Sequence, residues 1–231
     1  TGFLLMNVGK SIKFSSNGLL TTLSCSYDNK PQYALEGSVF IAGAAIQWLR
    51  DSLKIIDKAS DTEKISQKIP DLENIYVVPA FAGLGAPYWD MYSRGAIFGL
   101  TRDSGRGEII KATLESLAYQ TKDVIDAMEE DSNIKINSLK VDGGACMNNY
   151  LMQFQSDILN CEVTRPKIVE STAMGAGYLA GLKSDIWDIS KIKSNQEIDS
   201  TFSPQITDER RNILYDGWRD AVKRTFNWVK K

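Results

Sequence analysis

The sequence predicts an α/β fold in which three short antiparallel strands are followed by strand-helix units, with helices on both faces of a mixed sheet. Three observations indicate it. Short β-prone runs separated by turn residues open the chain. A long helical stripe of apolar residues occupies 108–128, and a strand, a glycine turn and a helix follow one another over 138–151. Helix-linked strands after antiparallel strands are typical of a sheet covered on both faces.

The first part of the chain predicts an antiparallel meander and then a helix. The expected strands are 3–7, 19–26 and 33–35, and Asn17-Gly18, a strong hairpin signal, precedes the second. From residue 36 to 53 the pattern changes to helical spacing, with Val39, Ala42, Ile46 and Leu49 along one face. We therefore expect a helix over 36–53.

The middle of the chain predicts an insertion and then the longest helix. Residues 54–71 are charged and are expected to form a solvated helix or loop, 75–80 a buried strand, and 81–90 a loop rich in glycine, proline and aromatic residues. Apolar residues then keep helical spacing from Glu108 to Met128. We treat 1–231 as one domain, with about 54–108 as the insertion.

The last part predicts further strand-helix units. Expected strands are 139–141 and 161–164, a helix begins near Asn148, and 171–182 forms a helix whose small residues suit close packing against its neighbours. Residues 183–204 are polar and are expected to be irregular. A terminal helix is expected over 208–230 within the final segment, 205–231, with Trp218 and Trp228 in packing roles.

Composition excludes several functional classes. The chain of 231 residues is 43% hydrophobic and 24% charged, which is ordinary for a globular protein, and its formal charge is −2. That charge supplies no basic field for nucleic acid. No run approaches the roughly 20 apolar residues of a membrane-spanning helix. The chain starts without Met on an apolar strand, and we expect it to be a piece of a longer protein.

The reactive side chains narrow the chemistry. The three cysteines are widely spaced, without a paired metal-ligand pattern, and they indicate a reduced, cytoplasmic compartment. The chain contains no histidine, so Ser-His and Cys-His catalytic pairs and histidine metal sites are excluded within it. Any chemistry must use carboxylates, hydroxyls, backbone groups and cations.

The turn Asp142-Gly143-Gly144 is the strongest local candidate for a ligand site. Two glycines between a strand and a helix allow positive φ and close approach of a ligand, and the helix start offers unpaired N–H groups to an anion. A phosphate cradle is one interpretation. The other is a tight turn in which Asn148 is the N-cap of the helix, and local sequence alone favours this simpler one.

Longer motifs resemble a known family. The order of elements is similar to one half of the actin-like, ribonuclease-H-like ATPase fold, in which nucleotide lies between two such halves. The run GAIFGLTRDSGRGEIIKATLES, residues 95–116, resembles the C-terminal signature of the FGGY carbohydrate kinases. Further matching runs are NGLLTT, YALEGSVFIAGAAIQWLRD, YVVPAFAGLGAPYWD, ATLESLAYQT and VDGGACMNN, so the resemblance covers essentially the whole chain.

The resemblance implies a set of site residues. Carried over position by position, it makes Gly43, Gln47, Gly144 and Asn148 nucleotide contacts. Gly43 and Gln47 are four residues apart, which places them on one helix face. Without the family, helix packing at Gly43 and a surface amide at Gln47 would be the simpler interpretation.

Two further positions depend on the resemblance at the start of the chain. Phe3 matches an aromatic residue that packs on the carbon skeleton of glycerol, although an ordinary strand residue is the alternative. Thr1 and Gly2 are similar to a Thr-Gly turn that holds the terminal phosphates of ATP. The family pattern has one more residue between that glycine and the aromatic residue, which this sequence lacks.

The implied reaction is transfer of the γ-phosphoryl group of MgATP to a primary hydroxyl of glycerol. In the family, the aspartate base, most glycerol contacts and most Mg²⁺ ligands belong to an N-terminal domain, so this chain is expected to be inactive alone. The full-length enzyme is expected to be a homo-oligomer. The alternatives are a kinase of the same family for another sugar or polyol, or a non-catalytic actin-like nucleotide-binding module.

The remaining motifs are given structural roles. The 81–90 loop is expected to be structural or interface-forming. Gly175 and Gly177 lack dinucleotide-binding spacing and are expected to allow close helix packing, and residues 99–107 lack the G-K-[ST] of a P-loop.

Overall fold

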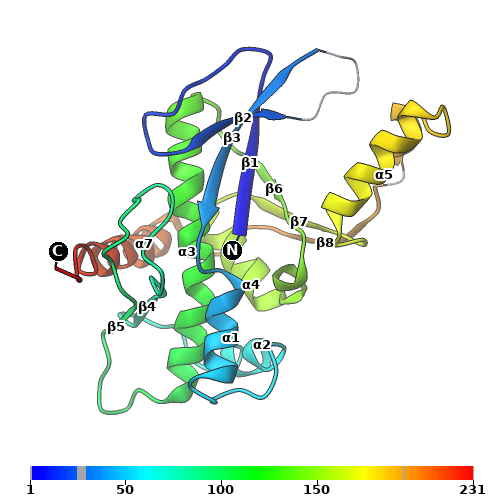
Figure 1. The fold of residues 1–231 in the computed structure, drawn as a ribbon. Helices are drawn as coiled ribbons and strands as arrows, with labels where there is room; N and C mark the ends of the chain where they lie inside the picture. Colours follow the sequence, from blue (N-terminus) through cyan, green and yellow to red (C-terminus); the bar gives the residue numbers. More distant parts are fainter. Residues whose placement is uncertain (1, 25–29, 195, 231) are drawn as a thin grey trace.

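The fold is built around one long helix. The computed structural model describes residues 2–24, 30–194 and 196–230. Helix α3, Arg106–Ser132, runs through the molecule and buries Ile110, Leu114, Val124 and Met128 at 2% exposure or less (Figure 1). Its start is fixed by Glu108, whose carboxylate accepts a hydrogen bond from the Gly105 N–H at 2.9 Å. The predicted helix over 108–128 is confirmed, and it extends two residues further at its start and four at its end.

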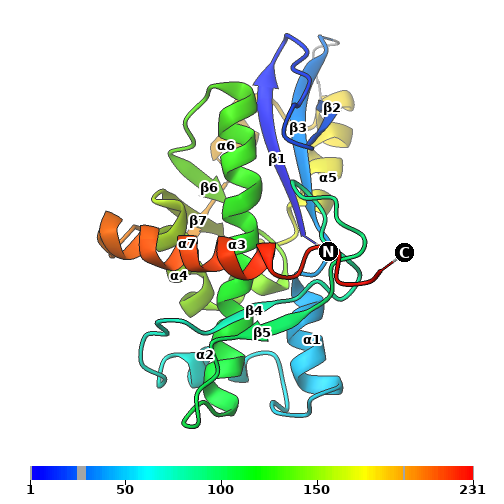
Figure 2. The ribbon, with the colours of Figure 1, turned by 90° about the vertical axis from the view of Figure 1, so that its left-hand side faces the viewer.

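The first sheet lies against α3. Strands β1 (Gly2–Gly9), β3 (Gln32–Val39) and β2 (Leu20–Ser24) are antiparallel, in the order β1-β3-β2 (Figure 2). The three antiparallel strands are confirmed, but the meander order is wrong because β3 is central. A Cβ at Gly37 of β3 would collide with Val124, so the glycine lets α3 approach this strand closely.

The predicted helix over 36–53 begins too early. Strand β3 continues to Val39, which pairs with Gly2 of β1, and helix α1 is Gly43–Asp51. Val39 and Ala42 have helical spacing with the true helix, but β3 lies between two partner strands, and its backbone hydrogen bonds hold 36–39 in the sheet. Tertiary pairing therefore overrides the local periodicity.

The 54–108 segment holds short elements and the aromatic loop. Helix α2 is Asp61–Ser66, and strands β4 (Tyr76–Val78) and β5 (Ala96–Phe98) pair antiparallel; β5 was not predicted. The loop over 81–90 is closed by hydrogen bonds from Leu84 N to the Asp90 carbonyl and from Trp89 N to the Gly85 carbonyl, both at 2.9 Å. These bonds agree with a structural role for the loop.

The second half forms another sheet. Strand β6 (Ser138–Lys140) is parallel to β7 (Glu162–Pro166), and β7 is antiparallel to β8 (Ile198–Phe202). Among the described residues the ladders form three separate sheets rather than one mixed sheet. The expectation that 183–204 is irregular is wrong, because α6 (Ile189–Ser194) and β8 lie there. Strand β8 is at a sheet edge and largely exposed, so its apolar alternation is weak.

Helices α4 (Asn149–Leu159) and α7 (Asp208–Lys223) pack near α3. The terminal helix ends at Lys223 rather than near residue 230. Asn227 takes a left-handed φ of 52° and its N–H donates to Asp90 Oδ2 at 2.8 Å, which turns the chain toward the aromatic loop. Trp218 is fully buried, but Trp228 is 70% exposed, so the predicted packing role holds for Trp218 alone.

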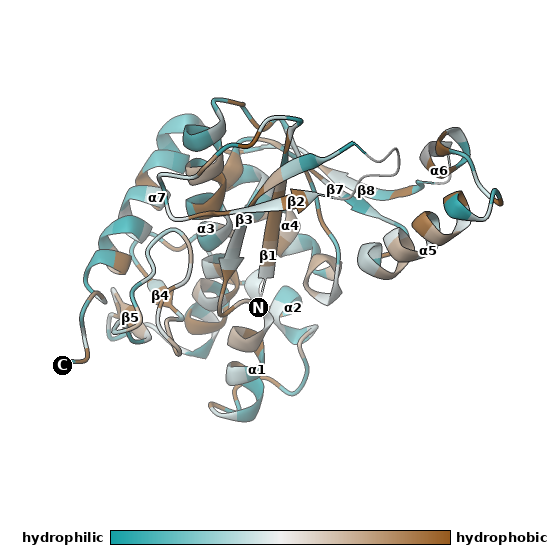
Figure 3. Cartoon of the chain, turned by 45° about the horizontal axis from the view of Figure 1, so that its top comes forward, coloured by the Kyte–Doolittle hydropathy of each residue, from teal (hydrophilic) through white to brown (hydrophobic). Residues whose placement is uncertain are grey.

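Helix α5 (Ser171–Lys183) stands away from the other elements together with α6 (Figures 1 and 3). Gly181 is its one buried residue, packed under Trp187. A Cβ at Gly175 or Gly177 would meet no described atom within 4 Å, so the predicted close packing of these two glycines is wrong for this chain. An apolar helix exposed on most sides has a surface that a partner can cover.

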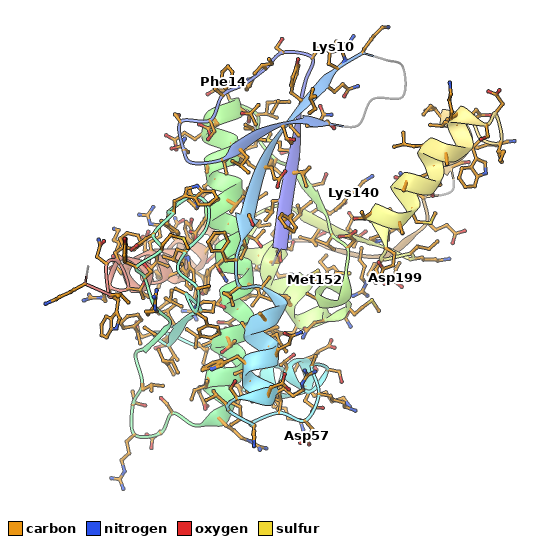
Figure 4. The ribbon with its side chains drawn as sticks, viewed as in Figure 1. Lys10, Phe14, Asp57, Lys140, Met152 and Asp199 are labelled. Carbon is orange, nitrogen blue, oxygen red and sulfur yellow. The ribbon has the colours of Figure 1, made fainter. Side chains whose placement is uncertain are left out.

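The connection between β1 and β2 lies at the end of the molecule opposite α1 and α2 (Figure 1). Lys10 and Phe14 lie there, far from Asp57 in the loop after α1 (Figure 4). Asp131 at the end of α3 anchors this connection by accepting hydrogen bonds from Ser16 and Asn17. In the described parts of the chain, no helix has both the length and the apolarity needed to cross a lipid bilayer.

Candidate functional site

Four of the predicted nucleotide contacts line one cavity. Gly43, Gln47, Gly144 and Asn148 all border a cavity of about 290 Å³ between α1, α2, α3 and the start of α4. Its volume is near the lower end of the range for small-molecule pockets. The floor is apolar, with Ile46, Leu114 and Leu151, whereas amides, a carboxylate and a guanidinium lie among the other lining residues. The nucleotide role of the four residues stays a prediction.

The two glycines of the turn before α4 differ in their backbone conformation. Gly143 has a φ of 79°, which favours glycine, and its N–H donates to the Val169 carbonyl at 3.0 Å. Gly144 begins a short 3-10 helix, η1 (Gly144–Met147), which was not predicted, and it has no such backbone requirement. A Cβ on Gly144 or on Gly43 would meet no described atom within 4 Å. Packing within the chain therefore explains neither residue, and both leave the cavity open.

The structure places Asn148 where it can both cap α4 and contact a ligand in the cavity. It is the N-cap of α4, because its Oδ1 accepts a hydrogen bond from Leu151 N at 2.9 Å. It also borders the cavity, and its Nδ2 donates to Thr62 Oγ1 at 3.1 Å. The capping interpretation is thus correct, and it leaves the side chain at the cavity wall.

Arg165 fixes the backbone of this corner. Its buried guanidinium donates from Nη1 to the Cys146 carbonyl at 2.7 Å and to Asn149 Oδ1 at 3.0 Å. The same side chain forms an ion pair with Asp199 of β8 at 2.7 Å. These bonds hold η1 and the start of α4 against β7 and β8, so the position of Gly144 is set by the sheet.

Helix α2 forms a wall that sequence reasoning missed. Thr62 and Glu63 of α2 line the cavity together with Ala59, which precedes the helix, and Glu63 Oε1 accepts a hydrogen bond from Asn149 N at 3.1 Å. The charged composition of 54–71 predicted a solvated surface, and no local signal distinguishes Thr62 from an exposed helix residue. Its burial, at 1% exposure, becomes evident only from the packing of α2 against α3 and α4.

Strand β1 contributes no residue to the lining of this cavity, although its Gly2 lies next to Ala42, the residue before Gly43. Phe3 on β1 is 63% exposed and is not one of the lining residues. Thr1 lies outside the described residues. Among the described residues, no group of three or more Asp, Glu, Cys or His side chains is placed to hold a metal ion.

A buried carboxyl group lies beside the site. Glu115 on α3 is 4% exposed and accepts a hydrogen bond from the Tyr150 hydroxyl of α4 at 2.5 Å. Burial raises the pKa of Glu115 to about 7, against the lowering effects of the Tyr150 bond and of Lys111. It borders a second, smaller cavity of about 110 Å³ with Asp157 and Arg210. Its environment is that of a structural buried acid.

Glu115 should make stability depend on pH. Its folded pKa of about 7 lies above its ordinary value of 4.5, so the folded state binds the proton more tightly and loses stability as pH rises. From pH 6 to pH 8 the deprotonation of Glu115 alone should lower the free energy of unfolding by about 1 kcal/mol. Glu115→Gln should remove this change. Urea denaturation of both proteins at pH 6, 7 and 8 measures it. A residual slope is expected from Asp123, whose pKa burial also raises to about 7. Equal slopes in the two proteins would contradict this role of Glu115.

Comparisons with known proteins show to which family this chain is similar. The model of the FGGY family of carbohydrate kinases, C-terminal domain, matches residues 1–184. A glycerol kinase from Alkaliphilus oremlandii is 58% identical over 230 residues, which are 99% of this chain and 46% of that protein. The chain therefore spans about half the length of such curated relatives.

Solved structures agree in fold. The crystal structure of Plasmodium falciparum glycerol kinase with ADP matches with a TM-score of 0.90 at 38% identity, over 96% of this chain and 45% of that one. A ligand-bound xylulose kinase from Lactobacillus acidophilus matches with a TM-score of 0.80 at 22% identity, over 97% of this chain and 46% of that one, a likeness in fold alone.

Proposed function

Because the chain belongs to the FGGY family of carbohydrate kinases, we propose that it is the nucleotide-binding half of an ATP-dependent glycerol kinase. The reaction transfers the γ-phosphoryl group of ATP to a primary hydroxyl of glycerol and yields glycerol 3-phosphate and ADP. One observation carries the proposal: Gly43, Gln47, Gly144 and Asn148, from separate segments, border a single cavity that their small or amide side chains leave accessible. The likeness to a glycerol kinase that binds ADP supports the choice of ligand.

Each residue has a role that its chemistry permits. Gly43 and Gly144 admit the sugar and phosphates because no side chain occupies their faces of the cavity. Gln47 and Asn148 carry amides that can donate to or accept from the nucleotide. We propose that Phe3 packs on the carbon skeleton of glycerol and that Thr1, which lies outside the described residues, contacts the terminal phosphates.

The remaining parts of the reaction are assigned to the other half of the enzyme. Mg²⁺, which neutralises charge on the phosphates, would take ligands mainly from that half and from ATP. The carboxylate base that accepts the glycerol hydroxyl proton would also come from there. We accordingly expect the 231-residue chain alone not to turn over.

The exposed helix α5 supports the proposed partner. Its apolar residues and the open glycines 175 and 177 are suited to close contact with another element, and the described chain supplies none. We assign this surface to the N-terminal domain of the same enzyme. The enzyme would be cytoplasmic, in agreement with the free, buried Cys146 and Cys161, and homo-oligomeric at full length.

Asn148 provides the direct test of this proposal. Replacing Asn148 by alanine should weaken ADP binding by about 0.5–1.5 kcal/mol, because one hydrogen bond to the ligand is lost. Calorimetric titration of ADP into the 231-residue chain measures the change. The same variant should also lose about 1 kcal/mol of stability as a helix cap.

Two further variants separate these effects. Asn148→Ser keeps a capping oxygen and should restore stability but not ADP affinity. Asn212→Ala removes an exposed asparagine of α7 and should change neither. Unchanged ADP affinity in Asn148→Ala would mean that Asn148 only caps the helix.

Titration of the full-length enzyme with glycerol and other polyols would distinguish the family's alternative substrates.

A further inference from the structure

Thr62 makes a directional pair of hydrogen bonds at the wall of the cavity. Its hydroxyl donates to the Ala59 carbonyl at 2.7 Å and accepts from Asn148 Nδ2 at 3.1 Å. A hydroxyl has one proton, and that proton is committed to the Ala59 carbonyl. Toward Asn148, Thr62 can therefore only accept.

The other end of the Asn148 amide is fixed as well. Its Oδ1 accepts from Leu151 N at 2.9 Å, as the cap of α4. If the amide were turned over, its NH₂ group would face the Leu151 N–H and its oxygen would face the Thr62 oxygen, and both hydrogen bonds would be lost. Thr62 and the helix start together permit one orientation of the amide. In that orientation one Nδ2 proton and one lone pair of Oδ1 stay available to a ligand.

Thr62 is not needed to hold α2 in place. Glu63, the next residue, bonds to Asn149 N at 3.1 Å, and Ile65 of α2 packs on the main core cluster. Loss of the Thr62 hydroxyl should thus leave the helix docked and affect mainly the Asn148 amide.

We propose that Thr62 is a positioning residue of the nucleotide site, which holds the Asn148 amide in the one orientation that binds the nucleotide. This inference rests on the proposed function, because it assigns a purpose to the orientation of Asn148. The residue acts through Asn148 and makes no contact with the reacting groups.

Calorimetric titration of ADP into the 231-residue chain tests the inference. Thr62→Val keeps the shape of the side chain and removes the acceptor, and it should weaken ADP binding about three- to tenfold. Thr62→Ser restores the hydroxyl and should bind within about twofold of the unmutated chain. Thr113→Val is the matched control: Thr113 is also buried and bonded to a carbonyl of its own segment, Ile109 at 2.7 Å, but it does not line the cavity.

The Asn148 side-chain amide gives a second readout. In ¹H–¹⁵N spectra without ligand, its two Nδ2 protons should be well separated, and one should be protected from exchange by Thr62. Thr62→Val should reduce both the separation and the protection, whereas Thr62→Ser and Thr113→Val should retain them.

The outcomes distinguish the two proposals. If the unmutated chain binds ADP and Thr62→Val binds it equally well, the positioning role is overturned and the proposed function stands. Equal weakening by Thr62→Val and Thr62→Ser also overturns it, because the methyl packing rather than the hydroxyl would then matter. If the unmutated chain does not bind ADP, the proposed function fails and the inference fails with it.

Discussion

Replacing Trp218 by alanine should lower the free energy of unfolding by about 3–5 kcal/mol. The indole is fully buried, stacks on Tyr119 with ring centroids 5.3 Å apart, and donates from Nε1 to Asp123 at 2.9 Å. Its removal leaves a cavity between α3 and α7 and takes a donor from a buried carboxyl group. Urea denaturation followed by circular dichroism measures the change.

Trp228 supplies the matched control for that experiment. It is the same residue type near the same end of the chain but is 70% exposed, so Trp228→Ala should change stability by about 0.5 kcal/mol or less. Similar losses in both variants would show that α7 does not pack as described.

Filling the cavity at Gly144 should weaken ADP binding by about 1–3 kcal/mol, or roughly 5- to 150-fold. A leucine there finds open space in the unliganded chain, so the fold should tolerate it, while its side chain occupies room that the nucleotide needs. Calorimetric titration with ADP and a parallel denaturation curve measure both properties.

Gly175→Leu is the control for this substitution. Gly175 also has open space around its Cβ position, but it lies on α5 and does not line the cavity. The 231-residue chain carrying it should bind ADP as the unmutated chain does. Unchanged ADP affinity in Gly144→Leu would mean that the nucleotide does not use this cavity.

Local sequence predicts the fold well where the residues of an element determine its conformation by themselves. The helix α3 has a long apolar stripe, and its extent is close to the predicted 108–128. Prediction fails where contacts with residues distant in the sequence determine the conformation. Residues 36–39 are held in β3 by pairing with β1, and Glu36 also pairs with β2, while β8 is a weakly apolar edge strand paired with β7. Gly175 and Gly177 of α5 have no packing partner among the described residues, although their spacing predicted close helix packing.

The candidate site was accessible to sequence reasoning only in part. Family resemblance indicated Gly43, Gln47, Gly144 and Asn148, and the structure places these four around one cavity. Spacing alone could not separate Gly143, which has the backbone requirement, from Gly144, which has none. No local pattern indicated Thr62, because its burial depends on how a short charged helix packs against α3 and α4.

The most direct measurement of the nucleotide site is a titration of the ¹⁵N-labelled chain with ADP, followed by ¹H–¹⁵N correlation spectra. We expect saturable shifts centred on the backbone amides of Gly43 and Gly144 and on the side-chain amides of Gln47 and Asn148. Shifts centred instead on the smaller cavity beside Glu115, or no shifts at millimolar ADP, would contradict a nucleotide site between α1, α2 and α4.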